Sequence, residues 1–305
     1  MLFATRRSFN ATKNILTNNP SSVTRYLSIK SATEPPAKWR DGFYKREDWL
    51  RFVMQEASTN EVLIYVHGFN TTQAGNLRRL DKIKAGLKAQ GYKGAVIGFD
   101  WPSSGNPLDY DGDLGRAKQT AQYLISELAI PLMFLPERPK VHLLAHSMGG
   151  YSVLKGLQDM GDSKGPGNWA LDQVVFASAD VHQPSMERGA WGALIMRHRS
   201  KRFTNYYSGD DNVLKLSKFI NGTRKRVGRA GLPSPAFSTH IDVSCTAQFR
   251  RDETNLPDIS FLSHRWWFES APFYKDLALT LAGKDGFSSG TRLKGPGRDF
   301  TLNVS

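Results

Sequence analysis

Short apolar runs, rich in branched and aromatic residues, alternate along the chain with longer amphipathic segments. The apolar runs predict buried β-strands at residues 62–66, 95–99, 141–145, 173–179, 203–207 and 241–247. The amphipathic segments place apolar residues three and four positions apart and predict α-helices at 73–90, 113–130, 148–160 and 271–281. This alternation predicts an α/β protein with a mostly parallel central sheet and helices on both faces.

Both ends of the chain differ in composition from this alternating part. Residues 1–35 are basic, rich in Ser, Thr and Asn, and contain no acidic residue before Glu34. This composition is typical of a mitochondrial presequence, so we expect a presequence or a disordered segment outside the fold. Residues 284–305 are Gly-rich and polar and predict a flexible tail, which leaves the domain at 36–283. We expect a mitochondrial location, with the cytoplasm as the alternative.

The net charge of +13 is compatible with binding to nucleic acid or to an anionic membrane. Much of the excess lies in residues 1–40, and local basic clusters lie at 197–202 and 224–229. Neither cluster matches a nucleic-acid-binding motif, so solvated surface charge is the favoured interpretation and no nucleic-acid partner is expected. No apolar run approaches the ~18 residues of a transmembrane segment.

The sharpest motif is VHLLAHSMGG at residues 141–150, where a predicted strand runs into a predicted helix. It matches the nucleophile elbow G-x-S-x-G, with Ala145 at the first small position and Gly149 at the second. Bulky side chains at either place would collide with the neighbouring strand and helix. The turn lifts the Ser147 hydroxyl above the sheet, near a helix N-terminus that favours a developing anion. Ser147 is therefore predicted to be a nucleophile rather than a helix cap.

A second motif, His67-Gly68-Phe69, follows the strand predicted at 62–66. Acyl-transfer enzymes stabilise the oxyanion with two backbone amides. We expect one amide from Met148, which follows the nucleophile, and the other from Phe69. Gly68 lets the backbone approach the substrate closely, and the His67 side chain is expected to hold the loop by a hydrogen bond.

After an elbow of this kind, the acid and then the histidine of a catalytic triad follow along the chain. His264 precedes the last helix in a predicted loop that should hang over the elbow, and it is favoured over His240, which opens a strand. Three acids lie near strand ends, namely Asp180, Asp210 and Asp211. Asp210 and Asp211 point different ways, so only one of them can orient the histidine.

With these motifs, the chain resembles the alpha/beta-hydrolase family of unknown function known as DUF nine-hundred. The motifs that carry the resemblance are residues 65–70, 101–105 with Tyr110 and Asp113, the elbow, 176–180, 207–217 and 229–231. The resemblance implies an alpha/beta-hydrolase fold and an esterase or lipase activity. It also aligns the family's acid with Asp211 and not with Asp210.

These observations predict a serine hydrolase that cleaves a carboxylic ester or thioester through Ser147, Asp211, His264 and an acyl-enzyme. The alternative is a catalytically silent binding protein of the same fold. Residues 181–202 are too few for a large cap domain, so we expect an open site. A small-molecule or lipid ester is the expected partner. No metal-ligand cluster and no dinucleotide fingerprint are visible, so neither a metal nor a cofactor is expected.

Overall fold

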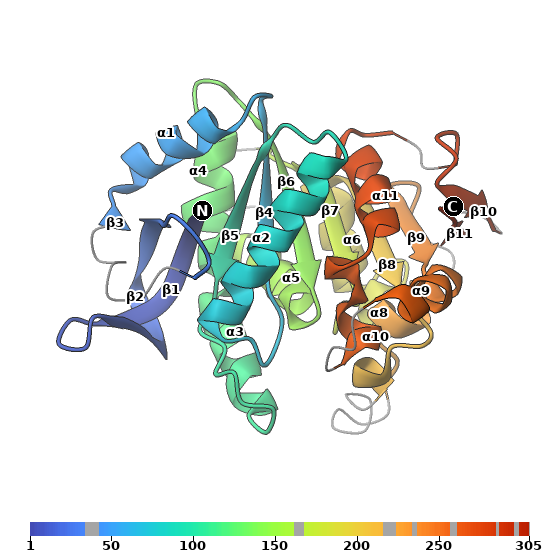
Figure 1. Ribbon diagram of the computed structural model, residues 1–305, viewed down its shortest axis with the longest axis horizontal. Coiled ribbons are helices and arrows are strands. Elements are labelled where there is room, and N and C mark those ends of the chain that lie inside the picture. Colours follow the sequence, from blue (N-terminus) through green and yellow to red (C-terminus); the bar gives the residue numbers. More distant parts are fainter. Residues whose placement is uncertain are drawn as a thin grey trace.

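The computed structural model describes residues 1–33, 43–161, 168–215, 224–233, 237–256, 261–284, 287–295 and 299–304. Within these residues the strands form one sheet in the order β10-β11-β9-β8-β7-β6-β4-β5-β1-β2-β3 (Figure 1). Its parallel centre consists of β5 (Ala95–Asp100), β4 (Glu61–Val66), β6 (Lys140–His146), β7 (Leu171–Ala177), β8 (Ser200–Tyr207) and β9 (His240–Ser244). These are the six strands that the apolar runs predict.

Side chains along the inner strands point alternately to two apolar layers, as the period of two in a strand requires. In β4, Val62 and Ile64 belong to one buried cluster, whereas Leu63 and Tyr65 belong to the other. The first cluster is covered by α1 (Arg46–Glu56), α3 (Tyr110–Leu124), α5 (Met148–Met160) and α6 (Trp191–Arg199). The second is covered by α2 (Gln73–Ala89), α9 (Thr246–Asp252) and α11 (Ala271–Leu281). The predicted fold class is confirmed.

The segment between β7 and β8 is short. Its described residues hold only the 3-10 helix η3 (Gln183–Met186) and α6, so no large cap domain is inserted there.

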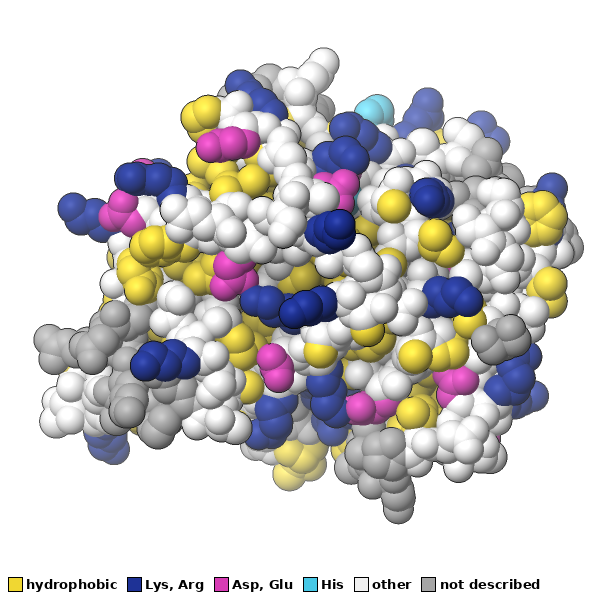
Figure 2. Space-filling view, turned by 45° about the horizontal axis from the view of Figure 1, so that its top comes forward, with side chains coloured by type: hydrophobic (Ala, Val, Ile, Leu, Met, Phe, Trp, Pro, Cys, Tyr) yellow, Lys and Arg dark blue, Asp and Glu magenta, His cyan; other side chains and the backbone are white. Residues whose placement is uncertain are grey.

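The surface carries charges of both signs. Lys and Arg side chains are spread over the face seen in Figure 2, with Asp and Glu side chains among them. In the described part of the chain, no helix has both the length and the apolar character needed to cross a bilayer.

The helix predicted at 113–130 is interrupted near its end. It consists of α3, the π-helix η2 (Ile125–Ala129) and α4 (Ile130–Met133). Pro131 has no N–H to donate to the carbonyl of Glu127. That carbonyl instead accepts a hydrogen bond of 2.7 Å from the hydroxyl of Tyr26 in the N-terminal part of the chain. The proline therefore leaves an acceptor that a distant segment satisfies.

The expectation that residues 1–35 lie outside the fold is wrong. Residues Leu2–Asn10 form β1, which pairs in parallel with β5, and Ile15–Ser28 form β2, which pairs with β1 and with β3 (Phe43–Tyr44). Phe3 and Leu27 are fully buried. The apolar residues between the basic ones are thus strand positions. The expected boundary at 35/36 lies outside the described residues.

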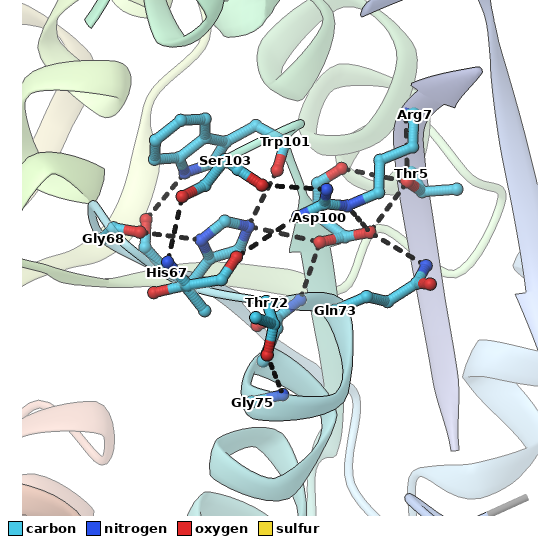
Figure 3. Close-up of polar contacts among 12 residues, drawn as sticks. Thr5, Arg7, His67, Gly68, Thr72, Gln73, Gly75, Asp100, Trp101 and Ser103 are labelled. Atoms are coloured by element: carbon cyan, nitrogen blue, oxygen red, sulfur yellow. Dashed lines mark hydrogen bonds and ion pairs between the residues drawn. The ribbon is translucent and has the colours of Figure 1, made fainter. Parts of the chain in front are cut away.

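Two basic residues of this segment, Arg6 and Arg7, are themselves buried. Arg7 is 1% exposed and its Nε–H donates to Oδ2 of Asp100 at 2.9 Å (Figure 3). The Arg6 guanidinium lies 3.5 Å from the centre of the Tyr123 ring and 3.7 Å from the Glu127 carboxylate. The composition that suggested a presequence therefore has a structural explanation, and a mitochondrial location stays a prediction.

The expectation of a flexible tail at residues 284–305 is also wrong for the residues of this segment that the structure describes. Asp299–Leu302 form β11, which pairs in parallel with β9, and Arg292–Lys294 form β10, which pairs with β11. The Arg292 guanidinium is 3% exposed and donates to the carboxylate of Asp276 at 2.7 Å. Residues 285–286, 296–298 and 305 lie outside the described residues. The two described termini thus lie at opposite ends of the sheet (Figure 1).

We predict that Arg7→Met destabilises the protein by about 3–5 kcal/mol, because it leaves the fully buried Asp100 without its cationic partner. Urea denaturation measures the change in the free energy of unfolding. The matched control is Arg51→Met, which breaks a solvent-exposed pair with Asp48 and should cost about 0–1 kcal/mol. Equal losses in the two variants would show that the burial of the Arg7–Asp100 pair is energetically irrelevant.

The same carboxylate predicts sensitivity to acid. Burial by itself raises the pKa of Asp100, but the charge of Arg7 and a hydrogen bond from His67 bring this pKa down to about 2. Since the unfolded side chain titrates near ~3.9, the stabilisation is complete above about pH 4 and is lost as the pH falls from there through about 2. Asp100→Asn should flatten this part of the curve of unfolding free energy against pH. An unchanged slope in the variant would contradict the assignment.

Candidate active site

Ser147 lies on a strained turn between β6 and α5. Its backbone angles are φ 56° and ψ −126°, a combination that non-glycine residues rarely adopt. Hydrogen bonds hold the turn on both sides: the N–H of Ser147 donates to the carbonyl of Ala177 at 3.2 Å, and its carbonyl accepts from the N–H of Asp180 at 2.9 Å. The predicted elbow is therefore present, with Ser147 directly before the first residue of α5.

Two glycines allow the elbow to pack this closely. A Cβ atom on Gly149 would lie 2.4 Å from the carbonyl oxygen of Val66, in the strand beside the elbow. A Cβ atom on Gly68 would lie 2.6 Å from the Cβ of Ser147. Since real Cβ contacts are longer than this, both positions require glycine. The loop after β4 thus touches the serine directly.

Two backbone N–H groups near Ser147 have no hydrogen-bond acceptor in the part of the chain that the structure describes. Met148 is the first residue of α5, so its N–H has no acceptor within the helix. The N–H of Phe69 donates to no acceptor among the described residues. Met148 follows Ser147 directly in the sequence. Phe69 follows Gly68, which packs against Ser147. These are the two amides that the sequence predicts for an oxyanion hole.

The His67 side chain fixes the loop that carries Phe69 (Figure 3). Its Nδ1 lies 3.0 Å from the carbonyl oxygen of Gly68, and its Nε2 lies 3.0 Å from that of Trp101 and 3.2 Å from Oδ1 of Asp100. The ring stacks on the Trp101 indole with centroids 4.9 Å apart, and the indole N–H donates to the carbonyl of His67 at 2.7 Å. The predicted structural role of His67 is confirmed.

Asp211 and His264 lie together although 53 residues separate them. The carboxylate of Asp211 accepts a hydrogen bond of 2.7 Å from Nδ1 of His264, and its other oxygen accepts from the N–H of Leu214 at 2.9 Å. Asp211 is fully buried and His264 is 6% exposed. His264 lies on the short helix α10 (Leu262–Arg265), not in the loop expected there. Because a carboxylate only accepts, Nδ1 carries a proton, and in the neutral imidazole the lone pair is then on Nε2.

The other candidate acids have different partners. Asp210 forms an ion pair of 2.7 Å with the exposed Arg250. Asp180 borders the same pocket as Ser147, but its carboxylate accepts from the Tyr110 hydroxyl at 2.8 Å and lies 3.0 Å from Nε of Arg226. Neither acid therefore orients His264 in this structure.

The alternative histidine, His240, is buried at the start of β9 and does not border the pocket. Its ring packs edge-on against Phe203 and Phe237, at 5.3 and 5.2 Å between centroids. Burial lowers the pKa of His240 to about 4. These contacts are those of a core histidine.

His146 precedes the serine, and no motif in the sequence indicates a role for it. Its Nε2–H donates to the backbone carbonyl of His264 at 2.8 Å, and the two rings lie 4.6 Å apart. Burial, together with the charges of His264 and Arg79, holds the pKa of His146 well below its usual range. A neutral His146 thus ties the elbow to the helix that carries His264. Only its position beside Ser147 could have indicated this role.

Ser147 and His264 border one pocket of about 190 Å³. Its apolar lining includes Phe69, Tyr110 and Leu214. Within the described residues, no hydrogen bond joins the Ser147 hydroxyl to the His264 ring. Nor do the described side chains include a group of three or more His, Cys, Asp or Glu that could hold a metal ion.

Comparisons with known proteins place the chain among hydrolase-like sequences. The family model described as "Alpha/beta hydrolase of unknown function (DUF900)" matches residues 44–272. The uncharacterized protein alr1448 of Nostoc sp. is 26% identical over 247 residues, which cover 63% of this chain and 64% of that protein. The chain thus spans less than two thirds of the length of this relative.

Solved structures of esterases resemble the chain more distantly. Est1E from Butyrivibrio proteoclasticus is 12% identical with a TM-score of 0.42, covering 86% of this chain and 95% of that one. A truncated carbohydrate esterase from gut microbiota is 14% identical with a TM-score of 0.39, covering 86% and 96%. Inhibited esterase B from Lactobacillus rhamnosis is 14% identical with a TM-score of 0.41, covering 74% and 78%. Scores this low carry nothing about activity.

The close packing of the elbow predicts that Gly149→Ala destabilises the protein by about 1–3 kcal/mol, because the added methyl group forces the backbone of Val66 to move. The matched control is Gly115→Ala in α3, where an added Cβ meets no atom within 4 Å. That variant should be neutral or more stable by up to about 1 kcal/mol. Thermal or urea unfolding compares the two, and a neutral Gly149→Ala would contradict the packing described.

Proposed function

Since the chain belongs to the alpha/beta-hydrolase family of unknown function, we propose that it is a serine hydrolase acting on carboxylic esters or thioesters. Ser147 is the proposed nucleophile, His264 the base and Asp211 the acid of the triad. The observation that carries the proposal is the buried 2.7 Å hydrogen bond between His264 and Asp211, beside a serine on a strained turn. The proposal covers both the reaction that the protein catalyses and the class of substrate on which it acts.

The first proposed step is attack by Ser147 on the ester carbonyl. Nε2 of His264 accepts the hydroxyl proton while the oxygen forms a bond to the carbonyl carbon. The imidazolium that results is stabilised by the Asp211 carboxylate, which also fixes the tautomer of the ring. The unpartnered N–H groups of Phe69 and Met148 are the proposed donors to the oxyanion.

The second proposed step is collapse of the tetrahedral species. Nε2–H of His264 gives its proton to the departing alcohol or thiol, and the acyl group stays on Ser147. Water then attacks the acyl-enzyme, with His264 again as the base, and the acid and free serine are released. Apolar side chains such as Phe69 and Leu214 suit the pocket to a small or lipid acyl group. Neither step requires a cofactor.

The missing hydrogen bond between Ser147 and His264 is compatible with this mechanism. Catalytic hydrogen bonds are often long in the free enzyme and shorten only when substrate is bound. The same observation also suits the alternative, a catalytically silent binding protein of this fold. Labelling of the serine distinguishes the two, because a fluorophosphonate reacts only with an activated hydroxyl.

We predict that a fluorophosphonate probe labels the protein and that Ser147→Ala abolishes both the labelling and ester hydrolysis. Asp211→Asn should lower kcat by about 10⁴-fold, because the amide no longer fixes the His264 tautomer. The matched control is Asp210→Asn, which changes the neighbouring exposed acid and should leave kcat within a few-fold. Hydrolysis of 4-nitrophenyl esters of several chain lengths measures these rates.

Two results would count against the proposal. If the folded wild-type protein is neither labelled nor active on any ester or thioester tested, the silent binding protein is the better description. If Asp210→Asn and Asp211→Asn lower kcat equally, Asp211 is not the acid of the triad.

A further inference from the structure

Two arginines border the pocket on the side of α2 and α10. Arg79 comes from α2 and Arg265 directly follows His264 on α10; both are half-buried and line the same pocket as Ser147. The Arg265 guanidinium lies 5.5 Å from the centre of the Phe261 ring, and the Arg79 guanidinium lies 5.5 Å from that of Phe268. An aromatic ring thus lies near each cation, and one of the two rings, that of Phe261, also borders the pocket.

The acids of the pocket do not neutralise Arg79. Asp211 is occupied by His264, and Asp180 lies against Arg226 and Tyr110. Within the described residues, no carboxylate lies within ion-pair distance of Arg79, whose Nη1–H donates to the neutral hydroxyl of Thr71 at 2.8 Å. In the part of the chain that the structure describes, this guanidinium thus has no carboxylate partner, although it borders the pocket.

The two arginines also repel each other. Burial and the charge of Arg79 both lower the pKa of Arg265. Placing like charges at one half-buried site is unfavourable unless an anion lies between or beside them.

We propose that Arg79 and Arg265 form an anion subsite of the active-site pocket, so that the substrate is an ester or thioester that also carries a carboxylate or phosphate group. This inference rests on the proposed function of the same pocket. The guanidinium group suits both anions, since its planar set of donors matches pairs of carboxylate or phosphate oxygens. A wholly neutral lipid ester would leave the half-buried Arg79 without an anionic partner among the described residues.

A purely structural role for Arg79 has to be separated from this one. Thr71 accepts from Arg79 and donates from its own hydroxyl to the carbonyl of Phe69 at 3.1 Å. Loss of Arg79 could therefore disturb the oxyanion loop and slow the hydrolysis of every ester. The informative quantity is the ratio of kcat/KM for an anionic ester to that for a neutral ester of the same length.

The test compares 4-nitrophenyl hexanoate with the singly charged 4-nitrophenyl ester of adipic acid, in which a carboxylate replaces the terminal methyl group. A third ester, of 6-phosphonooxyhexanoic acid, tests phosphate in place of carboxylate. The wild-type protein should prefer at least one anionic ester by about tenfold or more in kcat/KM. Arg265→Gln and Arg79→Gln should each lower this preference by about tenfold, as expected for loss of a hydrogen bond to a charged group. Arg79→Lys should restore part of it.

The control is Arg51→Gln, which removes one exposed positive charge on α1 and should leave the ratio unchanged. The inference is wrong if the wild-type protein shows no anionic preference, if Arg51→Gln lowers the ratio as much as the pocket variants do, or if the Arg79 and Arg265 variants slow both esters equally. Fluorophosphonate labelling of Ser147 in the same samples shows that the proposed hydrolase is intact in each case.

A binding experiment tests the subsite even if the proposed function fails. Calorimetry with Ser147→Ala protein measures the binding of monomethyl adipate, which carries one carboxylate, and of the neutral methyl hexanoate. Tighter binding of monomethyl adipate, lost on adding Arg265→Gln, supports the subsite. Equal binding of the two esters, or binding of neither, overturns it.

Discussion

A fully buried carboxylate, Asp100, connects the N-terminal strand to the loop beside Ser147. Burial of an ionised carboxylate is costly unless cations and hydrogen-bond donors surround it. Here Arg7 donates at 2.9 Å, the hydroxyl of Thr5 at 2.9 Å and the amide of Asn76 at 3.3 Å, while Nε2 of His67 lies 3.2 Å away. The same His67 ring holds the loop that presents the Phe69 amide. The edge of the sheet and the proposed oxyanion hole therefore depend on one charge.

The site itself follows from the topology of a parallel sheet, whose strands all end at one edge. The loop after β4, the elbow after β6 and the turn after β8 meet there, and switch points of this kind are where open α/β sheets bind ligands. Close approach then decides the residue types: Gly68 touches Ser147, and Gly149 lies against the carbonyl of Val66. Local sequence could predict these features because each is encoded within a few residues of a strand end.

Features that depend on distant partners could not be predicted in this way. Composition made residues 1–35 look like a separate basic segment, because nothing near Arg7 in the sequence shows that Asp100 lies 93 residues away. The prediction of a flexible C-terminal tail was wrong for the same reason, because Arg292 is buried against Asp276. The choice between Asp210 and Asp211 came from the family resemblance. Its physical basis is the turn after β8, where the Asp211 side chain accepts the Leu214 amide and faces inward, while Asp210 meets exposed Arg250.

The charges around the pocket are unevenly distributed. Asp180, which borders the pocket, pairs with Arg226, and the buried Asp211 pairs with His264. His146, between the elbow and α10, is kept neutral by burial and by its cationic neighbours. With these acids paired, Arg79 has no carboxylate partner among the described residues, and apolar walls weaken solvent screening of its charge. A field of this sign favours negative charge in the pocket, whether it is an oxyanion formed during reaction or an anionic group that the substrate brings with it.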